Sequence, residues 1–229
     1  MKIKIAYQGR PGAYSHLACL KAFPNAEPIA CETFEEVFDK THKKETDISF
    51  IPVENSLAGR VADIHNLLPK TKLVITGEFF LKIDHQLLAI QSASLENIKF
   101  AVSHFHALAQ CREFLQENNI KPVLGTDTAG SAEELKKKGS NDTAAIASSL
   151  AAETYKLKIL KENIQDAHHN TTRFFIMKEK LDEKKIDNIK YITSFIFKIR
   201  NMPSALYKAL GGFASNKVNM LKLESYMMN

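Results

Sequence analysis

Residues 166–177 read D-A-H-H-N-T-T-R-F-F-I-M, a polar cluster set directly against an apolar run. The cluster, residues 168–173, carries imidazole, amide, hydroxyl and guanidinium groups. An arginine can hold a carboxylate through two parallel hydrogen bonds, while hydroxyl and amide groups donate to oxygens at fixed geometry. A loop that leads into a buried strand would give the same pattern. The stretch therefore indicates either a site for a small anion or an ordinary loop before a strand.

A short apolar strand followed by polar, helix-capping residues recurs along the chain. In open α/β sheets ligands bind just outside the carboxyl ends of strands, so these polar clusters and residues 166–173 are predicted to wall one cleft. The alternation of strands with helices predicts parallel sheets. The predicted strand and cluster pairs are 2–7 with 8–15, 47–51 with 53–59, 99–102 with 103–106, and 122–124 with 125–129.

Two connections are predicted to join two lobes, near residues 79–85 and near residues 164–169. The first belongs to a long apolar segment, residues 78–90, which reads as an extended strand interrupted at residues 82–86 and can carry the chain from one lobe to the other. We interpret His85 within it as a structural histidine whose ring is satisfied by hydrogen bonds.

Local signals mark the strand ends of the first lobe. Ser15 is predicted to cap the helix that follows the first strand, and the second strand is predicted to stop at Pro52. Glu54, Asn55 and Ser56 then present a carboxylate, an amide and a hydroxyl in consecutive positions. An Asx turn with a serine cap would explain Asn55 and Ser56, but it gives Glu54 no role.

Composition narrows the class of protein. The 229 residues suit one large domain or two small ones, and 45% hydrophobic and 25% charged residues are typical of a soluble protein. The formal charge of +5 comes from scattered lysines, which argues against nucleic acid as a partner. Cys19, Cys31 and Cys111 are widely spaced, which argues against disulfides and a zinc site. No apolar run has membrane-span length, so we expect a cytoplasmic protein without a membrane partner.

The end of the chain reads as a separate unit. Residues 179–190 are dense in charge and predict a linker. Residues 191–200 alternate like a strand, residues 205–214 predict a helix, and a further strand is predicted to begin at residue 218. The order is β-α-β.

Several segments together are similar to the prephenate dehydratase family. They occur in the order that the family has and span most of the chain, so the resemblance is stronger than any one motif. The segments are residues 8–15 (Q-G-R-P-G-A-Y-S), 52–59 (P-V-E-N-S-L-A-G), 103–111 (S-H-F-H-A-L-A-Q-C), 127–129 (D-T-A) and 170–174 (N-T-T-R-F).

The resemblance implies an architecture of two parts. The first is a catalytic domain of two α/β lobes, similar to type II periplasmic binding proteins, and the second is an α+β, ferredoxin-like ACT domain that binds phenylalanine. The implied domains are a catalytic domain at 1–178 (lobe 1 at about 1–80 and 168–178, lobe 2 at about 81–167), a linker at 179–190, and a partial ACT domain at 191–229.

The resemblance also implies a reaction. Prephenate dehydratases form phenylpyruvate from prephenate by loss of carbon dioxide and water, in phenylalanine biosynthesis and without a metal or cofactor. By resemblance, Thr172 donates to the departing hydroxyl, and Asn55 and Gln110 are further catalytic residues. The implied substrate-binding residues are Ser15, Ser56, Ser103, Thr126, Thr128, Thr171 and Arg173, and the implied supporting residues are Glu54, His104 and Phe174.

The regulatory motifs match only in part. Residues 201–206, N-M-P-S-A-L, correspond to the ligand-contacting turn of the family, with Ser204 where glycine is usual, and Tyr226 departs from the E-S-R-P motif. An ACT domain is β-α-β-β-α-β, and the sequence shows the first half. We therefore expect a catalytically competent chain that phenylalanine inhibits poorly. The implied regulatory residues are Ser204, Ala205, Leu206, Glu224 and Ser225.

Two other functions stay open. An arogenate dehydratase would use the same cleft for a substrate with an amine in place of the keto group. A non-catalytic, two-lobed module that binds small anions would keep the anion-binding loops and have no use for Thr172. The expected assembly is a homodimer or homotetramer, and the sequence does not decide whether Asn229 is a natural end.

Overall fold

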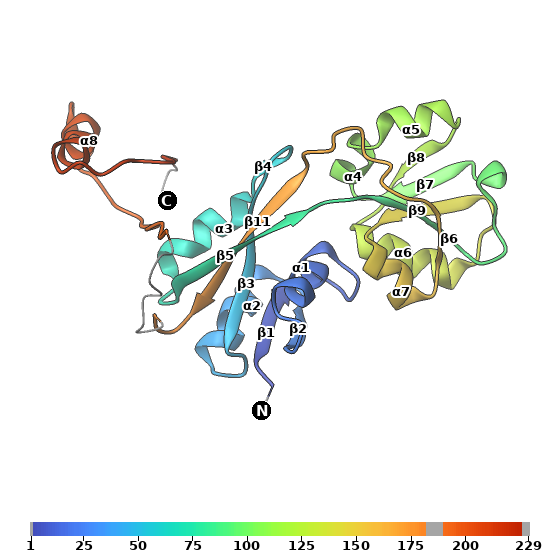
Figure 1. Ribbon diagram of the computed structural model, residues 1–229, viewed down its shortest axis with the longest axis horizontal. Coiled ribbons are helices and arrows are strands. Elements are labelled where there is room, and N and C mark those ends of the chain that lie inside the picture. The colour runs from blue at the N-terminus through green and yellow to red at the C-terminus, as the bar shows by residue number, and fades with distance from the viewer. Residues whose placement is uncertain (1, 182–189, 226–229) are drawn as a thin grey trace. The chain divides into compact units, whose positions relative to one another are not determined.

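The computed structural model describes residues 2–181 and 190–225, and the chain divides into two units, residues 1–183 and 184–229 (Figure 1). The first unit contains two β-sheets with helices on their faces. Among the described residues, none of the helices has the length and apolar character needed to cross a membrane.

The first sheet has six strands in the order β2-β1-β3-β11-β5, with β4 paired to β3. β1 runs parallel to β2 and β3, whereas β11 runs antiparallel to both of its neighbours. The strands are β1 (Lys4–Gln8), β2 (Glu27–Cys31), β3 (Ile48–Asn55), β4 (Gly59–Arg60), β5 (Val74–Lys82) and β11 (Thr171–Lys178), and the helices of this lobe are α1 (Tyr14–Ala22), α2 (Phe34–His42), α3 (Ala62–Leu67) and the 3-10 turn η1 (Leu68–Lys70).

The second sheet has five strands in the order β10-β6-β9-β7-β8. β7 is parallel to β8 and β9, while β6 is antiparallel to β9 and β10. The strands are β6 (Gln86–Ala89), β7 (Phe100–Ser103), β8 (Lys121–Leu124), β9 (Thr143–Ala147) and β10 (Lys158–Lys161), and the helices are η2 (Leu95–Asn97), α4 (Phe105–Ala109), α5 (Arg112–Glu117), α6 (Thr128–Lys138) and α7 (Ser149–Tyr155).

Each sheet buries both faces. In the first sheet, α1 covers a core in which the rings of Phe50 and Phe174 stack with centroids 4.8 Å apart, and α2 and α3 cover the opposite core around Ile51 and Phe175. In the second sheet, α4 and α5 cover one face, and α6 and α7 cover the other. Strands buried on both faces read as apolar runs, which is why short runs marked most strands in the sequence. The prediction of a two-lobed α/β fold is confirmed.

Two segments cross between the lobes and are hydrogen-bonded to each other (Figure 1). The Ile83 amide donates to the Asn170 carbonyl at 2.9 Å, and the Ile164 amide donates to the His85 carbonyl at 2.9 Å. The side chain of Gln165 accepts from the His85 amide at 2.8 Å. The crossings predicted near residues 79–85 and 164–169 therefore form a paired, two-stranded connection.

The prediction of parallel sheets was wrong in part, because both sheets are mixed. The second prediction that fails is the stop at Pro52, since β3 continues to Asn55. Opposite β11 the register shifts so that Arg173 pairs with Glu54 and Phe174 with Pro52. This bulge leaves Val53 without a partner residue and accommodates a proline that has no N–H to give to the ladder.

Other local predictions also need correction. Ser15 lies inside the first turn of α1, whose N-cap is Ala13, so it does not cap the helix. The segment 78–90, predicted with an interruption at residues 82–86, contains the end of β5 and all of β6, with the crossing between them, and β10 was not predicted.

The second unit contains α8 (Ala205–Ser215), which begins next to Ser204 in the left-handed region at φ 66°. The predicted helix is therefore present, but the described residues 190–200 and 218–225 form no strands. A strand needs a paired neighbour for its backbone groups, and sequence alternation alone does not supply one. Residues 182–189 of the predicted linker and Tyr226 lie outside the described residues.

Candidate functional site

Asn55 and Thr172 face each other as paired residues of β3 and β11. The Oδ1 atom of Asn55 accepts hydrogen bonds from the amides of Leu57 and Ala58 at 3.0 and 2.8 Å, which is an Asx turn. The turn fixes the side-chain amide, so its Nδ2 group points toward β11. It donates to Thr172 Oγ1 at 3.0 Å and to Asn170 Oδ1 at 2.7 Å. The Asx turn and the catalytic interpretation of Asn55 are thus compatible.

Asn170 connects this pair to Gln110 in the second lobe. Its side chain is fully buried, and its Nδ2 group donates to Gln110 Oε1 at 2.8 Å. Gln110 is the C-cap residue of α4. Asn55, Gln110 and Thr172, which are distant in sequence, therefore belong to one hydrogen-bonded group. Asn170 was absent from the predicted site residues, although it opens the N-T-T-R-F segment.

His85 and Tyr14 extend the group. Gln110 Oε1 lies 2.8 Å from His85 Nε2, and His85 Nδ1 lies 2.7 Å from the Tyr14 hydroxyl. Burial lowers the pKa of His85, which favours the neutral ring. Both ring nitrogens have partners, in line with the interpretation of His85 as a structural histidine. Tyr14 and His85 complete a chain of six side chains, which we call the amide network: Tyr14, His85, Gln110, Asn170, Asn55 and Thr172.

Two groups of the amide network keep unused donors. Within the described part of the chain, the hydroxyl hydrogen of Thr172 has no acceptor, and the Nε2 group of Gln110 has no partner. Both side chains are half-buried. A ligand that reaches them can therefore accept hydrogen bonds from a hydroxyl and an amide.

The hydroxyls of two predicted substrate-binding serines form hydrogen bonds with backbone groups. Ser103 is fully buried, and its hydroxyl donates to the Ile146 carbonyl at 2.6 Å, across from β7 to β9. The Ser56 hydroxyl donates to the His169 carbonyl at 2.9 Å and accepts from the Thr171 amide at 3.0 Å. These hydroxyls tie backbone segments together, so the hydrogen of each is already used within the fold.

Arg173 lies on the opposite face of the first sheet from Thr172, because neighbouring residues of a strand point to opposite faces. It contacts Glu78 Oε2 through Nε at 2.7 Å and through Nη2 at 2.6 Å, with Glu54 at 3.9 Å. Its guanidinium also lies 5.1 Å from the centre of the Phe175 ring. Arg173 and Glu54 thus form an ion pair on the face away from Thr172, which does not fit the predicted role of Arg173 in substrate binding. Phe174, in contrast, is buried on the same face of β11 as Thr172.

The loop after β1 contacts the second lobe. The Gly12 carbonyl accepts from Ser148 Oγ at 2.6 Å, and Arg10 pairs with Glu133 at 2.9 Å and with Asp127 at 3.5 Å. Asp127 is the N-cap of α6 and accepts from the Gly130 amide. This loop and the start of α6 are therefore adjacent, and they bring the first predicted motif beside the D-T-A segment.

The remaining predicted residues lie at or near the starts of helices α1, α4 and α6. Thr126 is exposed, and Thr128 and Ser15 are half-buried in or next to the first turns of α6 and α1. His104 is the N-cap of α4, where its Nδ1 accepts from the His106 amide at 3.3 Å, and burial lowers its pKa.

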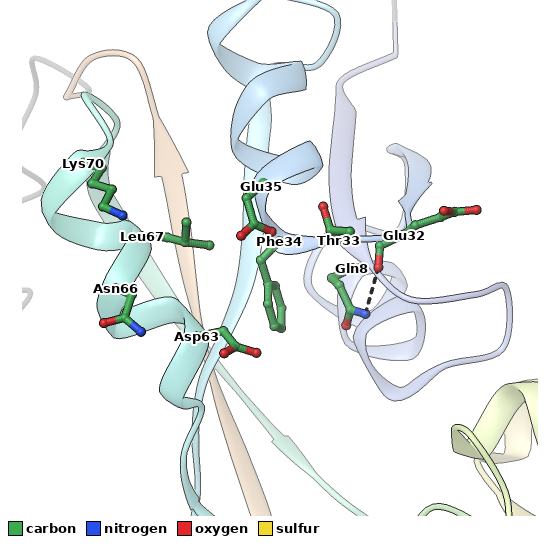
Figure 2. Close-up of a pocket in the computed structure, with 9 residues that line it drawn as sticks. All are labelled: Gln8, Glu32, Thr33, Phe34, Glu35, Asp63, Asn66, Leu67 and Lys70. Atoms are coloured by element: carbon green, nitrogen blue, oxygen red, sulfur yellow. Dashed lines mark hydrogen bonds between the residues drawn. The ribbon is translucent and has the colours of Figure 1, made fainter. Parts of the chain in front are cut away.

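A cavity of about 410 Å³ lies elsewhere in the first lobe, between the start of α2 and α3 (Figure 2). Gln8 Nε2 donates to the Glu32 carbonyl at its rim, at 3.3 Å. Glu32, Glu35 and Asp63 outnumber Lys70 in its lining, so it does not suit an anion, and it contains none of the predicted site residues. Within the described ranges 2–181 and 190–225, no group of three or more His, Cys, Asp or Glu side chains is arranged to hold a metal ion.

Comparisons with known proteins agree with the motifs. The family model for prephenate dehydratase matches residues 5–182. The chain is 44% identical to a bifunctional N-acyl-homoserine lactone acylase/prephenate dehydratase of Komagataeibacter europaeus, over 98% of this chain and 80% of that protein. It is 40% identical to arogenate dehydratase/prephenate dehydratase 1 of Arabidopsis thaliana, over 98% of this chain but only 57% of that protein's length.

A solved structure is similar as well. The prephenate dehydratase of Arthrobacter aurescens in complex with L-Phe superimposes with a TM-score of 0.79 at 27% identity, over 93% of this chain and 72% of that one. The family model alone covers most of the chain. This chain therefore belongs to the prephenate dehydratase family, whose members are lyases that act on carbon–oxygen bonds.

Proposed function

We propose that this chain binds prephenate against the amide network and converts it to phenylpyruvate, with Thr172, Asn55 and Gln110 as the catalytic residues. The observation that carries the proposal is the hydrogen bonding of Thr172. Its oxygen accepts from Asn55 Nδ2 at 3.0 Å, while its own hydrogen has no acceptor in the described part of the chain. A hydroxyl arranged in this way is a donor aimed at a ligand.

The proposed reaction needs hydrogen-bond donors of this kind. Prephenate carries a ring carboxylate and, opposite to it, a hydroxyl. When the bond to the ring carboxylate breaks, carbon dioxide leaves and the electron pair moves into the ring, which becomes aromatic. The carbon–oxygen bond breaks at the other side, and the departing oxygen takes one proton, supplied by solvent, to become water. The enzyme needs to stabilise negative charge that develops on that oxygen.

Thr172 is a weak acid, so we assign it hydrogen-bond donation to the leaving oxygen rather than complete proton transfer. The bond from Asn55 polarises the threonine hydroxyl and strengthens it as a donor. The free Nε2 group of Gln110 supplies a second donor, either to the same oxygen or to a carboxylate of the substrate.

Substrate binding by Ser15, Thr126, Thr128 and Thr171 remains part of the proposal. Ser15 and Thr128 lie in the first turns of α1 and α6, where free backbone N–H groups favour an anion. Arg10, which reaches from the first lobe to the start of α6, lies beside these turns and is paired there with Asp127 and Glu133. Prephenate has two carboxylates, so these groups suit its charge.

The test is turnover by the purified chain with prephenate and with arogenate, followed by the absorbance of phenylpyruvate in base and by chromatography of phenylalanine. We expect phenylpyruvate from prephenate. Phenylalanine formed from arogenate at a higher kcat/KM would establish the arogenate alternative, and binding of either compound without turnover would establish the non-catalytic module. Because one relative is also named an N-acyl-homoserine lactone acylase, an N-acyl-homoserine lactone belongs in the same assay.

Regulation and assembly are further parts of the proposal. A relative binds L-Phe, but Ser204 replaces the usual glycine and the described residues 190–225 contain one regular element, α8. We therefore expect phenylalanine at millimolar concentration to change neither activity nor melting temperature. We also propose a cytoplasmic homodimer or homotetramer, which sedimentation velocity tests, and the reduced state of Cys19, Cys31 and Cys111 fits that compartment.

A further inference from the structure

The hydrogen bonds of the amide network determine which way the Gln110 amide points. Its Oε1 atom lies 2.8 Å from Asn170 Nδ2 and 2.8 Å from His85 Nε2. An oxygen accepts both bonds if Nε2 of His85 carries the hydrogen. If the amide were turned over, its NH₂ group would face the Asn170 NH₂ group, and two donors would oppose each other in a buried place.

The Asn170 amide is determined in the same way. Its Oδ1 accepts from Asn55 Nδ2 at 2.7 Å, and the Asx turn fixes the direction of Asn55. Asn170 must therefore present Nδ2 to Gln110. The orientation is transmitted from a turn in the first lobe, through a fully buried side chain, to a residue of the second lobe.

The other end of the network is set by Tyr14. Its hydroxyl lies 2.7 Å from His85 Nδ1 and 3.2 Å from the Asp84 carbonyl, and it has one hydrogen to donate. Burial raises the pKa of Tyr14, so the hydroxyl keeps its hydrogen. Because Gln110 Oε1 can only accept, Nε2 of His85 carries the ring hydrogen, and Nδ1 of the neutral ring is left as the acceptor of the Tyr14 hydrogen. The hydrogen bonds from the Asx turn through Asn170, Gln110 and His85 to Tyr14 thus form one consistent series.

We propose that Asn170, His85 and Tyr14 are positioning residues that hold the Gln110 amide with its oxygen inward and its NH₂ group toward the ligand. The proposal deepens, and rests on, the proposed function at Thr172. Asn170 has a double role, because it also accepts a hydrogen bond from Asn55 Nδ2, the group that donates to Thr172. The three residues act through Gln110 and Asn55 and do not themselves touch the substrate.

The first test reads the position of the hydrogen directly and needs no substrate. In the ¹⁵N-histidine spectrum of the whole chain near pH 7.5, His85 is identified by the signals that His85→Gln removes. We expect a protonated Nε2 and an unprotonated Nδ1. The opposite tautomer, or a doubly protonated ring, overturns the proposal.

The second test separates positioning from simple loss of structure. Tyr14→Phe keeps the buried ring, and Asn170→Asp keeps the shape but removes the donor to Gln110. Groups that orient functional residues typically contribute 10–100-fold, so we expect kcat to fall by about 10-fold for Tyr14→Phe and about 100-fold for Asn170→Asp, with KM within about threefold. The exposed Tyr207→Phe and Asn118→Asp, which make the same atomic changes outside the network, should keep the parent kcat.

These outcomes distinguish the two proposals. A wild-type chain that shows the expected tautomer but does not turn over prephenate would refute the proposed function and support the orientation of the network. A chain that turns over prephenate while Tyr14→Phe and Asn170→Asp keep the parent kcat would refute the positioning role alone. A variant that does not fold leaves the tautomer measurement as the deciding one.

Discussion

Replacing Thr172 with valine removes one hydroxyl and keeps the branched shape of the side chain. The structure separates two consequences of this change. The fold loses the hydrogen bond from Asn55 Nδ2, which lies 3.0 Å from Thr172 Oγ1. The same Nδ2 group retains Asn170 Oδ1 at 2.7 Å and the Thr171 carbonyl at 3.4 Å, so it is not left without a partner.

The stability effect is therefore small. A neutral hydrogen bond contributes about 0.5–1.5 kcal/mol net, and the remaining bonds of Asn55 place this loss at about 1 kcal/mol or less. A domain stabilised by about 5–15 kcal/mol stays almost completely folded after such a loss. Unfolding consequently cannot lower the measured activity by more than a few per cent.

The catalytic effect is expected to be much larger. One donor to an oxygen that gains charge in the transition state contributes about 10²–10³-fold in kcat, which corresponds to about 2.7–4 kcal/mol. We expect Thr172→Val to lower kcat by at least about 100-fold, with little change in KM, because the hydroxyl acts mainly as the leaving group departs. Thr172→Ser, which keeps the hydroxyl, should recover most of the activity.

The assay is initial-rate formation of phenylpyruvate from prephenate over a range of substrate concentrations, with urea unfolding of each variant in the same buffer. If kcat stays within about threefold of the parent while KM rises, Thr172 binds the substrate in its ground state and the mechanism is refuted. Equal loss of kcat in the serine and valine variants would refute the role of the hydroxyl in another way.

Three further predictions concern stability, pH and charge. Gly12→Ala places a methyl group 2.8 Å from Ala151 Cα at a residue with φ +85°. The control is Gly139→Ala, at φ +66° with open space around the new methyl group, and we expect the midpoint of urea unfolding to fall further in Gly12→Ala. Equal falls in the two variants would contradict this. Burial lowers the pKa of His85 below 6.5, so as the pH falls through 6.5 the unfolded chain takes up a proton that the folded chain does not. The free energy of unfolding should therefore drop with acidification, and it should drop less in His85→Gln. An equal dependence of the free energy of unfolding on pH in both chains would remove His85 as the cause. Arg173→Lys loses the fork that contacts its carboxylate partners, so we expect a loss of about 1 kcal/mol in urea unfolding with KM for prephenate within about threefold, and a larger rise in KM would place Arg173 at the substrate.

The fold was readable because its strands are short apolar runs with polar residues at their carboxyl ends. The end of β3 shows where a prediction from such local patterns fails. A proline normally ends a strand, but the bulge opposite Arg173 lets β3 continue through Pro52 and delivers Asn55 to Thr172. The bulge depends on the partner strand β11, which lies more than a hundred residues away in sequence, so no local pattern could reveal it.

The predicted site residues also differ in how far local sequence patterns could place them. Thr172, Asn55 and Gln110 come from motifs, whereas the destination of a serine hydroxyl depends on which carbonyl the fold brings near. The Ser103 hydroxyl donates to the Ile146 carbonyl in β9, and the residues around Ser103 in the sequence do not predict this bond. Arg173 is different, because a signal was available. Once residues 171–178 are taken as a strand, neighbours must point to opposite faces, so Thr172 and Arg173 could not both face one ligand.

The position of Asn170 and His85 links the chemistry to the motion of the lobes. Both residues lie in the paired crossings rather than in either lobe, and the carbonyl groups of both accept bonds from the opposite crossing. Hinge residues absorb the changes in φ and ψ when two lobes rotate. Any rotation at these crossings would therefore alter the bond from Asn170 to Gln110, which joins a crossing to the second lobe. If the lobes rotate, their rotation and the orientation of the Asn170 and Gln110 amides are coupled, because the same side chains take part in both.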